Sequence, residues 1–418
     1  MPLVKKPING MKDILPPEMR LRDYLISLVK ETYRSFGFTP IETPVMESLD
    51  NLLSKQGGDN EKLIFKVLKR GEKLRINEAQ TEEDLSDSGL RYDLTVPLVR
   101  YYSNNEAELP KPFKALQIGP VFRADRPQRG RFRQFYQCDI DIIGEAGNLA
   151  ETELILATCT LLNKIGFKGF KVKINDRRLL TATADYCGVS RECCGQMFVI
   201  MDKLDKIGMD GVCRELCEAG FEASVSEKLQ AFFAAFEGGK PSLDLFAELL
   251  GNYADPEIVT NLKSIIAAAS SADGAYDLVF DPTLVRGMGY YTGPVFEIEI
   301  ADFGASCGGG GRYDGMVEKF TGRSVPACGF SIGFERIITI LLEQGFKIPD
   351  ERRRVAFLIE KNMPGERMAQ IISEAGELRR EGCEVSLLTM AKNKKFQKSQ
   401  LEADGIEEIK EYFINPIQ

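Results

Sequence analysis

The stretch FRADRPQRGRFRQFYQ, residues 122–137, decides how the sequence around it is interpreted. The segments 115–123 and 134–143 each have the character of a β-strand. Between them lies the long polar loop ADRPQRGRFR. We therefore expect a strand, an extended loop and a returning strand, with the loop standing out from the sheet.

This loop is the basic part of an acidic protein. The formal net charge of the chain is −8, which argues against a surface coated in nucleic acid but leaves room for a local basic site. A charge run often marks only a solvated face. Here guanidinium groups alternate with Gly, Pro, Phe and Gln, which favours planar recognition of phosphates. Against one acid, Asp125, the segment 114–133 carries Lys114, Arg123, Arg126, Arg129, Arg131 and Arg133.

The chain of 418 residues contains no histidine, which excludes whole classes of chemistry. A Ser-His-Asp triad, a Cys-His pair and an HExxH zinc site are all impossible within one chain. Catalysis must then use Arg, carboxylates, amides, Tyr or metal-bound phosphate. Adenylate formation fits this set, because the protein there mainly positions reactants and stabilises charge on phosphorus.

Length and composition indicate a cytoplasmic protein of two or three domains. No apolar run is long enough to span a bilayer, and the N-terminus lacks the apolar core of a secretory signal. Five of the 10 cysteines lie between residues 187 and 217, but no CxxC pair exists. We expect reduced thiols and no metal held by protein ligands.

The remaining pattern predicts an α+β fold with a helical insertion. Helical spacing marks 21–38 and 149–167, and residues 177–275 show helical periodicity with few strand signals. Beyond 351 the pattern is β-α-β-α-β, which predicts a small α/β domain. Other expectations are a hairpin at 61–76 around Arg70-Gly71, a strand and then a helix opening at Pro97, strands at 170–175, 276–281 and 289–301, a loop at GGGGRYDG (308–315), and a strand running into a helix over 328–344.

Three segments resemble the motifs of class II aminoacyl-tRNA synthetases. IETPVMES (41–48), with its Pro44, is similar to motif 1, residues 122–137 to motif 2, and GFSIGFERI (329–337) to motif 3. LVRGMGYYTGPVFE (284–297) and GGGGRYDG resemble the histidine-binding blocks of histidyl-tRNA synthetases, while 90–101 and 134–144 match the eukaryote-like form. The blocks follow family order and cover about residues 8 to 400.

The resemblance implies an antiparallel class II sheet flanked by helices, built from residues 1–176 and 276–345. It also implies a helical insertion domain at 177–275 and a shortened anticodon-binding-like α/β domain at 351–418. The implied activity is that of a histidine–tRNA ligase that uses ATP and Mg²⁺, with histidine and tRNA(His) as substrates. The implied assembly is a homodimer through motif 1, with no membrane association.

Site residues follow from the family's motifs. Catalysis would fall to Arg123 and Arg286, on either side of the α-phosphate, and ATP would meet Arg123, Arg133, Gly333 and Arg336. The histidine amino group would be held by Asp93, Thr95 and Gln137, and the imidazole by Asp141, Tyr290 and Tyr291. The end of the tRNA acceptor stem would contact Arg126, Gln128, Arg129 and Arg131. No metal is expected beyond magnesium on the ATP.

Two departures from the family keep an alternative open. Gly289 stands where the family usually has Asp, and we expect the C-terminal domain to lack the final strand and helix that the family usually has. Histidyl-tRNA synthetase paralogues also serve as catalytically silent, histidine-sensing regulatory subunits of ATP phosphoribosyltransferase. Retention of Arg123, Arg336 and the basic loop favours the ligase over this regulator.

Overall fold

The computed structural model describes residues 3–53, 62–236, 241–270, 276–285, 290–300, 306–349 and 351–415. Contacts divide the chain into two compact units. The first comprises Met1–Ile14 and Arg22–Gln344, and the second comprises Leu15–Leu21 and Gly345–Gln418. Among the described helices, none combines the length and apolar character that crossing a membrane requires.

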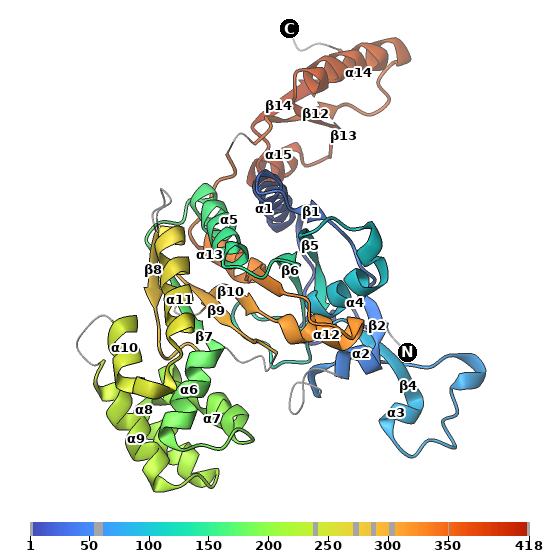
Figure 1. The fold of residues 1–418 in the computed structure, drawn as a ribbon. Coiled ribbons are helices and arrows are strands. Elements are labelled where there is room, and N and C mark those ends of the chain that lie inside the picture. Colours follow the sequence, from blue (N-terminus) through green and yellow to red (C-terminus); the bar gives the residue numbers. More distant parts are fainter. Residues whose placement is uncertain are drawn as a thin grey trace. The chain divides into compact units, whose positions relative to one another are not determined.

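The first unit is built on an eight-stranded sheet in the order β1-β5-β6-β11-β10-β9-β7-β8 (Figure 1). Neighbouring strands are antiparallel except for the outer pairs β1/β5 and β7/β8, which are parallel. The strands are β1 (Thr39–Pro40), β5 (Phe113–Phe122), β6 (Gln134–Ile143), β7 (Phe170–Asp176), β8 (Tyr276–Phe280), β9 (Pro294–Glu299), β10 (Ser306–Arg312) and β11 (Ala327–Ile332).

The expected strand–loop–strand unit is confirmed as β5 and β6. The two strands pair antiparallel over their full lengths, from Phe113 opposite Ile143 to Phe122 opposite Gln134. Apolar residues of both strands are buried, and the helices α5 (Leu149–Ile165) and α13 (Phe334–Glu343) pack against β6. The expected helices at 149–167 and at the end of 328–344 are therefore present.

The expectation of a loop at GGGGRYDG is wrong. Residues Gly308 to Gly311 form most of β10, an inner strand paired to β9 on one side and β11 on the other. Glycine is needed here for space, because a Cβ on Gly310 would lie 1.9 Å from the carbonyl oxygen of Gly329. Tight packing on both sides overrides the weak intrinsic strand preference of glycine.

Two expectations near the N-terminus also need correction. The hairpin around Arg70-Gly71 does not form. Instead β3 (Lys66–Leu68) pairs with β4 (Ser86–Leu90), which also pairs with β2 (Met46–Ser48) in a separate small sheet. The helix expected to open at Pro97 is α4 (Thr95–Asn105), which begins two residues earlier. It starts there because the Asp93 carboxylate accepts a hydrogen bond from the Val96 N–H at 3.0 Å.

The segment between β7 and β8 is helical, as expected. Because β7 and β8 are neighbouring parallel strands, this segment leaves the sheet and returns to it beside the strand it left. Its contacts group it with the first unit, so its standing as a separate domain stays a prediction. The described helices are α6 (Arg177–Cys187), α7 (Cys194–Met201), α8 (Leu204–Glu218), α9 (Ala223–Ala234), α10 (Leu243–Leu250) and α11 (Pro256–Ser270).

The second unit has the expected β-α-β-α-β pattern. Its parallel sheet has the order β13-β12-β14, and its core includes Phe357, Ile371 and Tyr412. The elements are β12 (Arg354–Ile359), α14 (Gly365–Arg380), β13 (Glu384–Thr389), α15 (Lys394–Ala403) and β14 (Glu408–Tyr412). The chain also contains the helices α1 (Pro16–Ser35), α2 (Leu49–Leu53), α3 (Glu82–Leu85) and α12 (Asp314–Thr321).

Candidate active site

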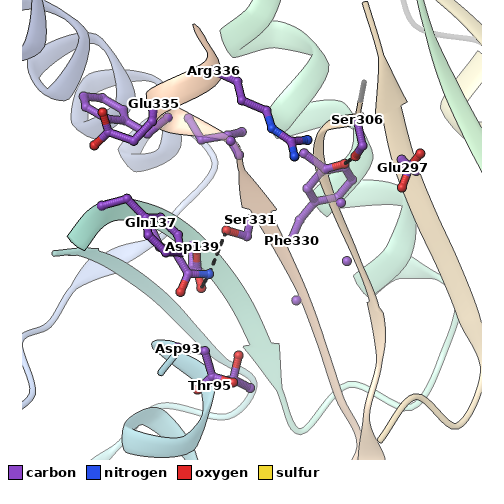
Figure 2. A pocket seen from close by; sticks show the side chains of 18 of the residues that line it. Asp93, Thr95, Gln137, Asp139, Glu297, Ser306, Phe330, Ser331, Glu335 and Arg336 are labelled. Atoms are coloured by element: carbon purple, nitrogen blue, oxygen red, sulfur yellow. Dashed lines mark hydrogen bonds between the residues drawn. The ribbon is translucent and has the colours of Figure 1, made fainter. Parts of the chain in front are cut away.

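A cavity of about 460 Å³ opens on strands β6, β10 and β11 of the large sheet. This volume lies in the range of small-molecule sites. Segments far apart in the sequence meet there (Figure 2). Of the residues that the sequence analysis selected, the cavity is lined by Asp93, Thr95, Arg123, Arg131, Gln137, Asp141, Tyr290, Tyr291, Gly333 and Arg336.

Three buried aspartates give the cavity its acidic end. Asp93 precedes α4, while Asp139 and Asp141 lie on β6 two residues apart and therefore face the same side of the sheet. One carboxylate oxygen of Asp93, one of Asp139 and the amide oxygen of Gln137 are buried without a hydrogen-bond partner among the described residues. Buried acceptors left unsatisfied are costly, so this group suits a cationic ligand.

Asp139 lines the cavity too, and the sequence analysis did not select it. Burial raises the pKa of its carboxyl well above the usual range, and the nearby Asp141 and Asp93 raise it further. The Gln137 side-chain amide donates to Asp139 at 3.3 Å and to the Ser331 hydroxyl at 3.2 Å (Figure 2). The signal in the sequence was the alternation of Gln137, Asp139 and Asp141 along one predicted strand.

Asp141 is fixed by its neighbours on the sheet. The Tyr313 hydroxyl donates to its carboxylate at 2.6 Å. Opposite Asp141 on β11 is Gly329, where an added Cβ would lie 2.0 Å from the same carboxylate oxygen. The ring of Tyr290 stands nearly perpendicular to that of Tyr313 and 6.2 Å away, and 4.7 Å from that of Tyr291. The oriented carboxylate of Asp141 and the aromatic rings of Tyr290 and Tyr291 therefore line the same cavity.

Arginines supply the cationic end of the cavity. The Arg123 guanidinium lies 4.2 Å from the centre of the Tyr92 ring and 5.1 Å from that of Phe135, and its Nε donates to the Tyr92 carbonyl at 3.1 Å. Arg336 extends from the first turn of α13 toward Ser306 and Phe330 (Figure 2). The cavity thus holds a carboxyl cluster and, with Arg131, three guanidinium groups, which suits a zwitterionic ligand beside an anionic one.

The helix that carries Arg336 is anchored by the preceding residue. Glu335 is buried and accepts two hydrogen bonds from the Arg22 guanidinium, at 2.7 and 2.8 Å. Glu335 also accepts from the N–H of Tyr136 on β6 at 3.1 Å. These bonds fix the start of α13 against the sheet and so set the direction in which Arg336 leaves the helix.

Comparison with known proteins identifies the family. A family model described as histidyl-tRNA synthetase matches residues 10–337. A histidine–tRNA ligase from Leifsonia xyli is 42% identical over 399 residues, which are 93% of this chain and 91% of the relative. The chain belongs to the histidyl-tRNA synthetase family. A probable histidine–tRNA ligase from Tropheryma whipplei is 43% identical over 359 residues, covering 81% of this chain and 80% of the relative.

Solved structures agree with this assignment. The crystal structure of histidyl-tRNA synthetase from Nostoc sp. PCC 7120 has a TM-score of 0.77 at 27% identity, covering 97% of this chain and 90% of that one. An ATP phosphoribosyltransferase regulatory subunit/histidyl-tRNA synthetase from Bacillus halodurans has a TM-score of 0.78 at 20% identity, covering 99% of both chains. The second likeness concerns the fold alone. The expected class II fold is confirmed.

In this member of the histidyl-tRNA synthetase family, only some of the arginines of the basic loop line the cavity. Arg131 lines the cavity, and two backbone hydrogen bonds of 3.1 and 2.9 Å join it to Gln128 and close the loop tip. Arg126, Gln128 and Arg129 are exposed and outside the lining, and Arg129 pairs with Glu343.

Two other arginines, Arg133 and Arg286, were selected from the family motifs. Arg133 does not line the cavity. Its side chain donates to the carbonyls of Asp125 and Asn9, both at 3.2 Å. Arg286, like Gly289, lies outside the described residues. The catalytic role of Arg286 therefore stays a prediction from the sequence.

Proposed function

We propose that this chain is a histidine–tRNA ligase, which joins histidine to ATP as histidyl-adenylate and then transfers histidine to tRNA(His). The observation that carries the proposal is the convergence of Arg123 and Arg336 on one cavity with three buried aspartates. These residues come from the end of β5, the start of α13, the loop before α4 and the middle of β6.

In the first step a carboxylate oxygen of histidine attacks the α-phosphorus of ATP, and pyrophosphate leaves. Negative charge grows on the phosphoryl oxygens, and fixed guanidinium groups stabilise it without reorganisation. Arg123 is suited to the α-phosphate because stacking on Tyr92 and Phe135 fixes its plane. Arg336 would meet the γ-phosphate, with Gly333 beside it in the lining of the cavity. In the second step a ribose hydroxyl of the tRNA attacks the acyl carbon, and AMP leaves.

The acidic end of the cavity would hold the two nitrogen-bearing groups of histidine. The unsatisfied oxygens of Asp93, Asp139 and Gln137 can accept hydrogen bonds from the ammonium group, with Thr95 beside them. Asp141, held by Tyr313, can accept from a ring N–H, and Tyr290 and Tyr291 flank the ring. A site built on such bonds rejects analogues that cannot form them by large factors.

Magnesium would enter with ATP. Among the described residues no group of three or more carboxylates or thiols could cage a metal ion. Mg²⁺ typically takes one or two protein carboxylates together with substrate phosphates. Glu297 lines the cavity on the side toward which Arg336 points (Figure 2), so it would be a protein carboxylate that helps to hold such an ion. When bound, the ion neutralises phosphate charge.

Other parts of the proposal concern partners. Arg126, Gln128, Arg129 and Arg131 would contact the acceptor end of tRNA(His), and the motif 1 segment 41–48 would form a homodimer interface. The three-domain division, with the insertion at 177–275 and the C-terminal domain at 351–418, belongs to the same proposal. Cytoplasmic location stays an expectation from the sequence.

The experiment that tests the ligase is histidine-dependent exchange of pyrophosphate into ATP, with each amino acid tried in turn. We expect exchange with histidine only, and a fall of about 10²–10³-fold in Arg336→Ala and in Arg123→Ala. Arg380→Ala, an exposed change in the last turn of α14, is the matched control and should leave exchange unchanged. Binding of histidine without any exchange by the wild-type protein would instead indicate a regulatory subunit.

A further inference from the structure

A second cavity, of about 400 Å³, lies where α6 and α7 meet the chain just before β9. It shares one wall residue, Tyr291, with the first cavity, and its other lining residues have no part in the proposed adenylation. Arginines dominate its polar lining, and they are Arg177, Arg178 and Arg191.

Two of these arginines are neutralised within the chain. Arg178 donates to the Asp176 carboxylate at 3.0 and 2.8 Å, and Arg191 to Asp185 at 3.1 Å. Among the residues that the structure describes, no carboxylate pairs with Arg177. Its guanidinium stacks 4.1 Å from the centre of the Phe198 ring, and Nη1 donates to the Val285 carbonyl at the long distance of 3.5 Å.

Arg177 therefore carries a partly buried charge that the described chain does not balance. Its side chain is half-buried, and this burial lowers the pKa of the guanidinium because the charged form is partly desolvated. A guanidinium has five N–H donors in a planar fork, and only one of them has a described acceptor. A desolvated charge with few partners costs stability unless an anion completes the site.

The start of α7 adds a second, independent feature for an anion. Cys194 and Gly195, the first residues of this eight-residue helix, line the cavity, and Cys193 before them provides no side-chain cap. The N–H groups of an uncapped first turn favour phosphate. A Cβ on Gly195 would meet nothing within 4 Å, so the approach to this helix end is open.

We propose that this second cavity binds a phosphodiester group of the tRNA strand whose end enters the first cavity. The inference rests on the proposed ligase function. A nucleic-acid strand carries a phosphate at each nucleotide, so one that delivers its terminal ribose past Tyr291 brings phosphates beside it. Arg177 and the first turn of α7 would hold one of them. The same chemistry could hold free pyrophosphate, and the test separates these two sources.

The test compares Arg177→Gln with the wild-type protein, and Arg214→Gln serves as the matched control. Arg214 is exposed on α8, lies outside both cavities and changes the net charge equally. We expect Arg177→Gln to weaken tRNA(His) binding on the order of tenfold, because a charged hydrogen-bond pair is lost. The slope of log Kd against log salt should fall by about 0.7–0.9, the value for one phosphate contact. Histidine-dependent pyrophosphate exchange should stay unchanged.

Other outcomes have distinct meanings. Unchanged tRNA affinity and salt slope in Arg177→Gln would overturn the proposal. A raised KM for pyrophosphate with unchanged tRNA affinity would assign the cavity to pyrophosphate instead. If Arg177 only stabilised the fold, Arg177→Gln would lower the melting temperature. Because the substitution instead removes an unbalanced charge, we expect the melting temperature to stay equal or to rise. Wild-type protein that fails to exchange pyrophosphate would defeat the ligase itself, which is a separate result.

Discussion

The substitution Gly329→Ala tests the geometry of the histidine end of the cavity. The new Cβ would lie 2.0 Å from Oδ1 of Asp141, 3.0 Å from its Cγ and 3.2 Å from Cε1 of Tyr313. Contacts closer than 3.0 Å are essentially never seen for a Cβ, so Asp141 must retreat by at least about 1 Å. That movement breaks the 2.6 Å bond from Tyr313, and both groups are buried.

The cost follows from this broken bond. Leaving a buried polar group unsatisfied costs about 1–3 kcal/mol, so Gly329→Ala should lower the free energy of unfolding by about 2–3 kcal/mol. The displaced carboxylate should also lose its bond to the histidine ring, which weakens histidine binding by roughly 10- to 100-fold. Urea unfolding and calorimetric titration with histidine, without ATP, measure the two effects separately.

A matched control is available on α14. Gly376→Ala places a Cβ 3.7 Å from its nearest neighbour, an ordinary contact, in the middle of a helix. It should raise the free energy of unfolding by about 0.5–1 kcal/mol and leave histidine binding unchanged. Wild-type histidine affinity in Gly329→Ala would refute the close approach of β11 to Asp141.

Three further predictions concern single side chains. Glu335→Gln removes the charge opposite the buried Arg22 and should lower the free energy of unfolding, measured by urea unfolding, by about 3–5 kcal/mol. A loss below about 1 kcal/mol would show that the pair does not anchor α13. The raised pKa of Asp139 means that its contribution to stability is present at low pH and is lost as pH rises through the folded-state pKa. Asp139→Asn should therefore gain stability relative to wild type from about pH 4 upward, and parallel pH profiles in urea unfolding would contradict this. Arg129→Ala should leave the melting temperature unchanged, because the exposed pair of Arg129 with Glu343 is screened by solvent. It should also leave pyrophosphate exchange unchanged but raise the KM for tRNA(His) several-fold, because a phosphate contact is lost. Equal losses in charging and exchange would place Arg129 with ATP.

The sequence predicted the elements whose pattern is local. The strands flanking the loop 124–133 and the helix α13 follow from apolar periodicity, and their ends fall within a few residues of the expected positions. The strand β10 could not be predicted in this way, because the glycines at 308–311 are selected by the neighbouring backbones and not by any preference of their own. Packing between distant segments is invisible to a local pattern.

The site residues also divide into those that motifs predicted and those whose surroundings depend on distant segments. Asp93, Gln137 and Asp141 were selected from motifs and do line the cavity, but Asp139 was passed over although it lies on the same face of β6. Arg133 was selected from the family motifs as an ATP contact, yet its side chain donates to the carbonyls of Asp125 and Asn9. A motif identifies which residue types are present, whereas the partner of each side chain depends on segments that the motif does not contain.

Two of the proposed functional groups, Arg336 and Asp141, are each fixed by a neighbouring residue. Arg336 follows Glu335, whose bonds to Arg22 and Tyr136 hold the helix start. Asp141 is held by Tyr313 and has space only because residue 329 is glycine. Preorganised charges stabilise a transition state without the cost of reorientation, so the anchoring residue contributes to rate without touching the substrate. Loss of an anchor should therefore reduce the rate of adenylation more than it weakens the binding of either substrate.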